Sequence, residues 1–233
     1  MTAPEARSDE LAANLAAVEE RVAQACVAAG RDPSELTLVA ISKTWPASDV
    51  ALLHHLGVRD FGENRDREAA EKAAELPGMR WHFVGAVQTN KARSVASYAD
   101  VVQSVDRLPL VTALGKGAVR AERVVDVLIQ VSLDGDPTRG GALPAEVEAL
   151  AAAVACTQGL RLAGLMAVAP RDAASSPAFE RLARVAASLR TAHPEANFVS
   201  AGMSGDLEAA IAAGANGLRV GTALFGHRPP PLG

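Results

Sequence analysis

One lysine, Lys43, stands where an apolar segment of the β type ends, and there it is a candidate for chemistry. The segment 37–42 reads Thr-Leu-Val-Ala-Ile-Ser, and short runs of Val, Ile and Leu are typical of buried parallel strands. A lysine at the carboxyl end of such a strand is held stiffly. Partial burial there favours the free amine that forms a Schiff base with a carbonyl compound. Position alone nevertheless favours a solvated lysine at the start of a loop, so the rest of the chain has to support the chemical role.

Hydroxyl groups and glycines follow two later β-type segments. Residues 200–204 read Ser-Ala-Gly-Met-Ser and residues 219–222 read Arg-Val-Gly-Thr, each directly ahead of an expected helix. Main-chain amides at helix N-termini hold anions, so the two turns could bind a phosphate, although the same residue types are ordinary helix caps. A phosphate site beside a lysine amine suggests pyridoxal 5'-phosphate (PLP), with its aldehyde bonded to Lys43. The residues that would hold its phosphate are Ser204, Gly221 and Thr222.

Eight β-type segments alternate with amphipathic helical segments along the chain and would position these residues. The expected strands lie at about 36–43, 58–61, 81–84, 101–105, 124–133, 160–168, 197–200 and 218–220. The fifth of them is the longest. A further amphipathic helix precedes the first strand and ends at Gly30. Strands that alternate with helices over about 200 to 250 residues are expected for a (β/α)8 barrel.

We therefore predict an α/β protein in which residues 1–233 form a single (β/α)8 TIM-barrel domain with an extra N-terminal helix. Residues 1–8 and 229–233 are expected to be loose termini. A doubly wound open sheet is the alternative, but Lys-Thr-Trp-Pro stands at 43–46, where that fold has Gly-x-Gly-x-x-Gly. In a barrel the chemistry lies at the carboxyl ends of the strands. Three further polar or polarisable residues expected there are Asn64, His82 and Met166. Each of these three also has a structural explanation, as a helix cap or a core residue.

Composition limits the possible functions. Of the 233 residues, 49% are hydrophobic and 21% are charged, and the net charge is -4, which gives no electrostatic argument for binding nucleic acid or an anionic membrane. No apolar run has membrane-spanning length and no signal-type segment begins the chain, so we expect a cytoplasmic location. The two cysteines, Cys26 and Cys156, lie in alanine-rich helical patterns and are interpreted as small core residues in a reducing compartment.

Seven motifs resemble the pyridoxal phosphate homeostasis protein family, and the resemblance runs in order from about residue 10 to residue 228. They are Ile-Ser-Lys-Thr at 41–44, Phe-Gly-Glu-Asn at 61–64, Trp-His-Phe-Val-Gly at 81–85, Gln-Thr-Asn-Lys at 88–91, Gly-Leu-Met at 164–166, Gly-Met-Ser at 202–204 and Arg-Val-Gly-Thr-Ala-Leu-Phe-Gly at 219–226. The resemblance implies a single-domain barrel similar to the N-terminal domain of bacterial alanine racemase. The chain departs from the family pattern at Arg65, where tyrosine is usual, and at Arg139-Gly140, which replaces a loop element that usually contains lysine.

The resemblance also implies roles for individual residues. Lys43 would carry PLP as a Schiff base, and the phosphate would be held by Ser204, Gly221 and Thr222, with Ser200 as a helper. Arg219 would face the pyridine nitrogen. The residues that would line the cofactor are Asn64, His82 and Met166. The family is thought to keep PLP bound and available without established catalytic turnover, so the resemblance implies a role in PLP homeostasis, with apo PLP-dependent enzymes as candidate partners.

Two observations favour binding over catalysis. An arginine beside the pyridine nitrogen opposes protonation of the ring, which makes the ring a poorer electron sink. A racemase also needs a second acid or base, and Tyr98, the single tyrosine, falls in an outer helix. The alternative function is a small fold-type-III PLP enzyme, such as an amino-acid racemase or decarboxylase, and a cofactor-free Schiff-base aldolase is another. The lack of a second domain leads us to expect a monomer.

Overall fold

The eight strands close into a parallel barrel. The structure, a computed structural model, describes residues 3–136, 138–170 and 174–226. Neighbouring strands pair in sequence order, and the last pairs with the first. The strands are β1 (Thr37–Ile41), β2 (Asp60–Glu63), β3 (Arg80–Phe83), β4 (Val101–Val105), β5 (Val125–Gln130), β6 (Leu160–Met166), β7 (Phe198–Ser200) and β8 (Gly217–Val220). This architecture confirms the predicted (β/α)8 barrel.

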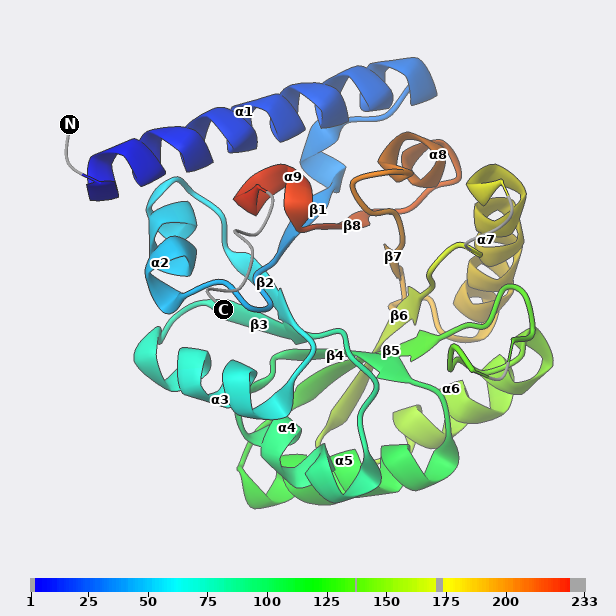
Figure 1. The fold of residues 1–233 in the computed structure, drawn as a ribbon. Coiled ribbons are helices and arrows are strands. Elements are labelled where there is room, and N and C mark those ends of the chain that lie inside the picture. The colour runs from blue at the N-terminus through cyan, green and yellow to red at the C-terminus, as the bar shows by residue number, and fades with distance from the viewer. Residues whose placement is uncertain (1–2, 137, 171–173, 227–233) are drawn as a thin grey trace.

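Helices surround this ring of strands (Figure 1). They are α1 (Ala3–Ala29), α2 (Ala47–His55), α3 (Asp66–Glu75), α4 (Ala92–Tyr98), α5 (Leu108–Arg120), α6 (Val147–Ala155), α7 (Ser175–Ala192), α8 (Leu207–Ala212) and α9 (Thr222–Phe225). Three short 3-10 helices are η1 (Pro33–Glu35), η2 (Thr89–Lys91) and η3 (Pro144–Glu146). Apolar side chains fill the layer between strands and helices. In the described part of the chain, none of the helices combines the length and apolar character needed to cross a bilayer.

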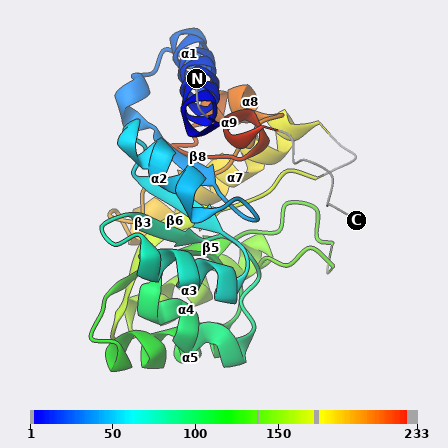
Figure 2. The ribbon, with the colours of Figure 1, turned by 60° about the vertical axis from the view of Figure 1, so that its left-hand side comes forward.

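The extra N-terminal helix, α1, packs on α8, α9 and α2 at one side of the barrel (Figures 1 and 2). Leu11, Leu15 and Val18 on its inner face are buried, because their spacing of three and four residues puts them on one helical stripe. The helix begins at Ala3. Residues 3–8 are therefore helical, and the prediction of a loose terminus over residues 1–8 is wrong for them. The tail at 229–233 lies outside the described residues.

Three sequence expectations differ from the structure. The second strand runs from Asp60 to Glu63, two residues later than expected, because Gly62 pairs with both neighbouring strands. The longest strand is β6 with seven residues, whereas β5 has six. Val124 is 65% exposed and stands outside the barrel wall, so the apolar run was longer than the strand. Cys26 is buried but Cys156 is exposed, since it follows α6 beyond the buried face that ends at Val154.

Gly164 allows β6 to bulge where it lies between β5 and β7. The β5–β6 register shifts at this point, so that Leu128 pairs with Gly164. Gly164 has φ +150°, and a Cβ atom there would lie 1.9 Å from the carbonyl oxygen of Phe198 on β7. Any side chain would therefore force the β6 and β7 main chains apart.

We expect Gly164→Ala to lower the free energy of unfolding by more than about 3 kcal/mol, because the new methyl group overlaps main-chain atoms that cannot move aside. Urea unfolding of the two proteins measures the difference. Gly205→Ala is the matched control, since no atom lies within 4 Å of its added Cβ. A Gly164→Ala variant as stable as the control would contradict this account.

Candidate functional site

Lys43 lies at the mouth of the barrel, two residues beyond the end of β1. Its side chain is exposed and makes no hydrogen bond or ion pair with any other described residue. The expectation of partial burial is therefore wrong. The reason is that Ser42 is the last buried residue before the chain turns, through Thr44 with φ +68°, and the amide of Trp45 closes the turn on the Ser42 carbonyl at 3.0 Å.

A buried ion pair supports this turn from below. The Lys72 ammonium on α3 donates to Glu63 Oε1 at 2.6 Å and to the main-chain oxygen of Ser42 at 2.9 Å. The Ser42 hydroxyl donates to the same Glu63 oxygen at 2.7 Å. Glu68 accepts from Lys72 at 2.8 Å and also from the amide of Thr44. The main chain on both sides of Lys43 is thus held by charged groups of α3.

The environment of Glu63 disfavours its charge. The side chain is 1% exposed, and burial raises the pKa of the Glu63 carboxyl, although Lys72 and the Ser42 hydroxyl partly oppose this shift. The sequence reasoning missed Lys72, because a Glu and a Lys four residues apart on a charged helix are usually a solvated pair. The structure turns both side chains toward the barrel instead.

The predicted phosphate residues of β8 and α9 lie beside the end of β1. Ala40 pairs with Val220, so Gly221 follows directly opposite Ile41. A Cβ on Gly221 would lie 3.4 Å from both the Cβ and the carbonyl oxygen of Ile41. Thr222, exposed, begins α9. Barrel closure therefore brings the lysine-bearing turn and the glycine-hydroxyl turn to the same stretch of the rim.

Ser204 lies in the turn between β7 and α8. Asp206 accepts a hydrogen bond from the amide of Met203 at 2.6 Å, and the carbonyl of Gly202 accepts one from the amide of Arg219 at 3.0 Å. The second bond ties this turn to β8. Among the residues described, the hydroxyls of Ser204 and Thr222 have no hydrogen-bond partner. Both hydroxyls are therefore free to bind a ligand.

Arg219 is a buried cation that forms no ion pair with a carboxylate of the described residues. Its guanidinium donates to the Ser200 hydroxyl at 2.7 Å and to the carbonyl of Ala167 at 2.8 Å. Burial lowers the pKa of Arg219 to about 10, and Asp206 opposes the shift. A guanidinium that has lost its water without gaining a counter-ion is costly. An acceptor supplied by a ligand would offset that cost.

A chain of hydrogen bonds continues from Arg219 through the barrel interior. The Ser200 hydroxyl donates to Gln103 Oε1 at 2.7 Å, Gln103 Nε2 lies 2.8 Å from His82 Nδ1, and His82 Nε2 lies 2.8 Å from Asp60 Oδ1. In this arrangement every donor points from the arginine toward the carboxylate. Gln103 was missed by the sequence reasoning, although an amide in the middle of the apolar strand β4 was a signal.

The predicted site residues thus fall into two groups. Lys43, Gly221, Thr222 and Ser204 are on the rim. His82, Ser200 and Arg219 are buried and belong to the interior chain of hydrogen bonds. Two others complete the set. Met166 is 3% exposed and packs with Val101 and Leu128 inside the barrel. Asn64 directly follows β2, and its Oδ1 is buried without a partner in the described structure.

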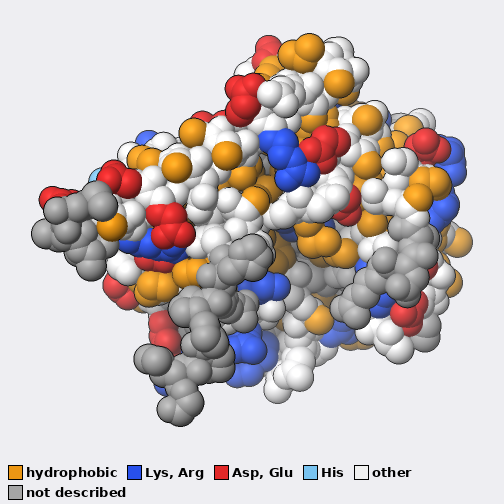
Figure 3. Space-filling model, turned by 45° about the horizontal axis from the view of Figure 1, so that its top comes forward, with side chains coloured by type: hydrophobic (Ala, Val, Ile, Leu, Met, Phe, Trp, Pro, Cys, Tyr) orange, Lys and Arg blue, Asp and Glu red, His pale blue; other side chains and the backbone are white. Residues whose placement is uncertain are grey.

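A hollow also opens at the carboxyl ends of β5 to β7. Its lining includes Gln130, Arg139, Met203 and Asp206, which places it next to the Ser204 turn. Arg139, one of the departures from the family pattern, is bonded there to Asp134 and to the carbonyl of Ala169. Basic and acidic side chains are interspersed over the face shown in Figure 3.

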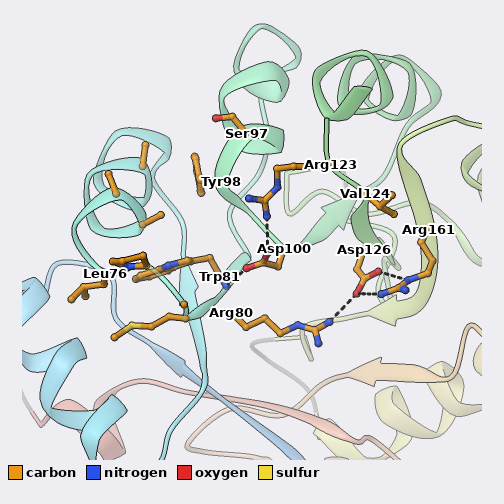
Figure 4. A pocket seen from close by; sticks show the side chains of 16 residues that line it. Leu76, Arg80, Trp81, Ser97, Tyr98, Asp100, Arg123, Val124, Asp126 and Arg161 are labelled. Carbon is orange, nitrogen blue, oxygen red and sulfur yellow. Dashed lines mark hydrogen bonds and ion pairs between the residues drawn. The ribbon is translucent and has the colours of Figure 1, made fainter. Parts of the chain in front are cut away.

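A second hollow lies at the opposite, amino end of the strands (Figure 4). Asp126 pairs there with Arg80 and Arg161, and Asp100 pairs with Arg123. These charges compensate one another, and this end of such barrels serves stability and not chemistry. The carboxyl-end rim is therefore the candidate functional site.

Comparison with known proteins agrees with this geometry. A family model described as the N-terminal domain of alanine racemase matches residues 8–229. A pyridoxal phosphate homeostasis protein of Mycobacterium bovis is 44% identical over 244 aligned positions, which cover 95% of this chain and 94% of the relative. The chain belongs to the pyridoxal phosphate homeostasis protein family. The resemblance in the seven motifs is thus confirmed.

A second pyridoxal phosphate homeostasis protein and a solved structure are also similar to this chain. The Escherichia coli protein is 40% identical over 228 positions, covering 94% of this chain and 97% of the relative. PipY of Synechococcus elongatus, in its structure with PLP bound, has a TM-score of 0.81 and 33% identity. That match covers 93% of this chain and all of that chain.

We expect Lys72→Met to lower the free energy of unfolding by about 3–5 kcal/mol at neutral pH, because it leaves the Glu63 carboxylate buried without a cation. The variant raises the pKa of Glu63 further. Since stability tied to a raised carboxyl pKa is present at low pH and lost as the pH rises through that pKa, the deficit should shrink as the solution is acidified.

Urea unfolding across a pH series measures this deficit. Lys116→Met, at an exposed lysine, is the matched control and should change stability by no more than about 0.5 kcal/mol. Adding Glu63→Gln to Lys72→Met should recover stability at neutral pH. A deficit that is independent of pH would show that the Glu63 charge is not its cause.

Proposed function

We propose that this protein binds PLP covalently through Lys43 and keeps it available in the cell, as a PLP homeostasis protein. One observation carries the proposal: Lys43 and the Gly221-Thr222 turn follow neighbouring strands, β1 and β8, and so share one stretch of the rim. In this arrangement the Lys43 amine can bind the aldehyde of PLP, and the Gly221-Thr222 turn at the start of α9 can bind its phosphate. PipY, whose structure contains PLP, supports the same ligand.

The side chains at the rim fit this cofactor. Among the residues that the structure describes, the Lys43 amine and the hydroxyls of Ser204 and Thr222 have no bonding partner, and Asn64 Oδ1 is buried and unbonded. In our proposal Lys43 binds the aldehyde, and Ser204, Gly221 and Thr222 bind the phosphate. Arg219 faces the pyridine nitrogen, held in place by Ser200. The cofactor wall comprises Asn64, His82 and Met166. When bound, PLP supplies an electrophilic aldehyde and an electron-accepting ring.

Two features favour retention of PLP over turnover of amino acids. A cationic Arg219 at the ring nitrogen opposes protonation there, because two like charges would adjoin. The hydroxyl of Tyr98 on α4 is 3.3 Å from Asp66 Oδ1, and burial together with that carboxylate raises the pKa of Tyr98. The Tyr98 hydroxyl is therefore hydrogen-bonded to Asp66 and is not suited to exchange a proton with a substrate at the rim.

We expect purified protein to bind PLP with a visible absorption band. Borohydride reduction of the imine should remove this band and leave the cofactor permanently attached to Lys43. Lys43→Ala should abolish this covalent attachment while leaving weaker, phosphate-anchored binding. Thr222→Val should keep the covalent band but weaken PLP retention about tenfold, because it removes a hydroxyl from the anion site. Peptide mapping after reduction and equilibrium dialysis measure the two effects. Attachment to another lysine, or no PLP binding at all, would refute the proposal.

We further propose that the PLP-loaded protein hands its cofactor to apo PLP-dependent enzymes, acting as a monomer in the cytoplasm. The loaded protein, mixed with such an apo-enzyme, should restore that enzyme's activity. Loaded protein whose bond between PLP and Lys43 has been reduced with borohydride should restore it more slowly, because the reduced bond does not release the cofactor. On its own the loaded protein should not racemise or decarboxylate the common amino acids. Turnover that depends on Lys43 would instead support the fold-type-III enzyme.

A further inference from the structure

We propose that Arg7, in α1, is a positioning residue. It keeps the turn that carries Lys43 and the turn that carries Gly221 and Thr222 in one fixed arrangement. The inference rests on the proposed function. It gives a role to a part of the chain that lies outside all seven sequence motifs. Arg7 touches neither Lys43 nor the phosphate residues, so it would act through the segments that carry them.

Arg7 bonds to the segments on either side of the rim. Its Nη2 donates to Asp49 Oδ2 at 2.6 Å and to the carbonyl of Phe225 at 3.0 Å, and its Nε donates to the same Asp49 oxygen at 3.1 Å. Asp49 is buried in the first turn of α2, the helix that follows the lysine turn. Phe225 is the last residue of α9. One guanidinium therefore links the element after Lys43 to the helix that begins with Thr222.

A stack of three side chains reinforces this link. The Arg7 guanidinium lies over the Trp45 ring, with Cζ 4.9 Å from the ring centroid. Trp45 in turn stacks on Phe225, with centroids 5.6 Å apart and an interplanar angle of 17°. Cation–π contact and offset aromatic stacking both favour this geometry. Trp45 is two residues from Lys43 and Phe225 is three from Thr222, so any shift of one turn is transmitted to the other.

Two other residues of α1 bind main-chain carbonyls of α9 and of the turn that contains Ser204. Asn14 donates to the carbonyl of Leu224 at 2.9 Å, and Arg21 donates to the carbonyl of Ser204 at 2.8 Å. These bonds satisfy main-chain oxygens at turns and at the end of a short helix, where the helix itself offers no donor. Because α1 is a continuous helix of 27 residues anchored by buried Leu11, Leu15 and Val18, it can hold both turns rigidly in place (Figure 1).

Arg7→Met removes the charge and the hydrogen bonds but keeps an unbranched side chain over Trp45. We expect it to weaken binding of three probes together: PLP, pyridoxal without phosphate, and inorganic phosphate, each by about tenfold, which corresponds to about 1.4 kcal/mol. Binding of pyridoxal tests the Lys43 side of the site alone, because pyridoxal has no phosphate. Binding of inorganic phosphate tests the side with Gly221 and Thr222 alone. The absorption band of the Lys43 link should also change its pH profile, because the turn that orients the amine has loosened.

Matched variants separate positioning from general stability. Arg67→Met replaces an arginine that is 92% exposed and pairs only with Glu71 among the residues described, and it should bind all three probes as wild type does. Circular dichroism of each protein establishes folding before binding is measured. If Arg7→Met does not fold, Trp45→Leu, which keeps Arg7 and its ion pair but breaks the stack, should show the same joint weakening.

Three results would overturn the inference. The first is folded Arg7→Met or Trp45→Leu protein that binds all probes as wild type does. The second is weakening of pyridoxal alone or phosphate alone, since that would show that Arg7 does not couple the two sides. The third is wild-type protein that binds no PLP at Lys43, which would refute the proposed function as well and is thereby distinguished from the first two.

Discussion

The pairing of β8 with β1 is the constraint on which the candidate site depends. All eight strands are parallel, so every carboxyl end lies on one rim. Closure then places the first chemical group of the chain, Lys43, next to the last, Gly221 and Thr222. A Cβ atom added to Gly221 would meet Ile41 at ordinary contact distance. An open sheet with the same strands would leave β1 and β8 at different positions along its width, and the two groups would not form one site.

Closure also creates an interior into which polar groups must fit, and the structure bonds nearly all of them. The chain from Arg219 through Ser200, Gln103 and His82 to Asp60 connects a cation near the rim to a carboxylate nearer the amino end. Buried polar groups are stabilising only when their partners are present. This chain therefore specifies the orientation of Arg219, while the guanidinium still forms no ion pair with a carboxylate of the described residues. Such an incomplete charge is expected at a ligand site and would be unfavourable in a purely structural core.

A second buried group, the ion pair of Glu63 with Lys72, holds the main chain next to Lys43 in place. Lys72 divides its three bonds among Glu63, Glu68 and the carbonyl of Ser42. The turn that carries Lys43 is thus fixed from α3 below, while Trp45 is fixed from α1 and α9 above. The amine itself is exposed and has no bonding partner in the described part of the chain. A stiff turn with a free side chain is suited to capture and retain an aldehyde, because the ordering of the main chain has already been achieved before binding.

The sequence by itself determined the order and number of strands, the fold class, and the residue types at the strand ends. These follow from local periodicity and from short motifs, which depend on few neighbours. Strand limits were less accurate at β2 and β5, and Cys156 was misplaced, since apolar residues also occur beyond the ends of elements.

Only the tertiary structure decided which side chains are buried and what they touch. Lys43 is exposed, Lys72 is internal, and Arg7 belongs to the site's support although it is 218 positions from the carbonyl that it binds. No local pattern encodes such contacts. They exist only because the barrel closes and α1 folds back over its last two helices.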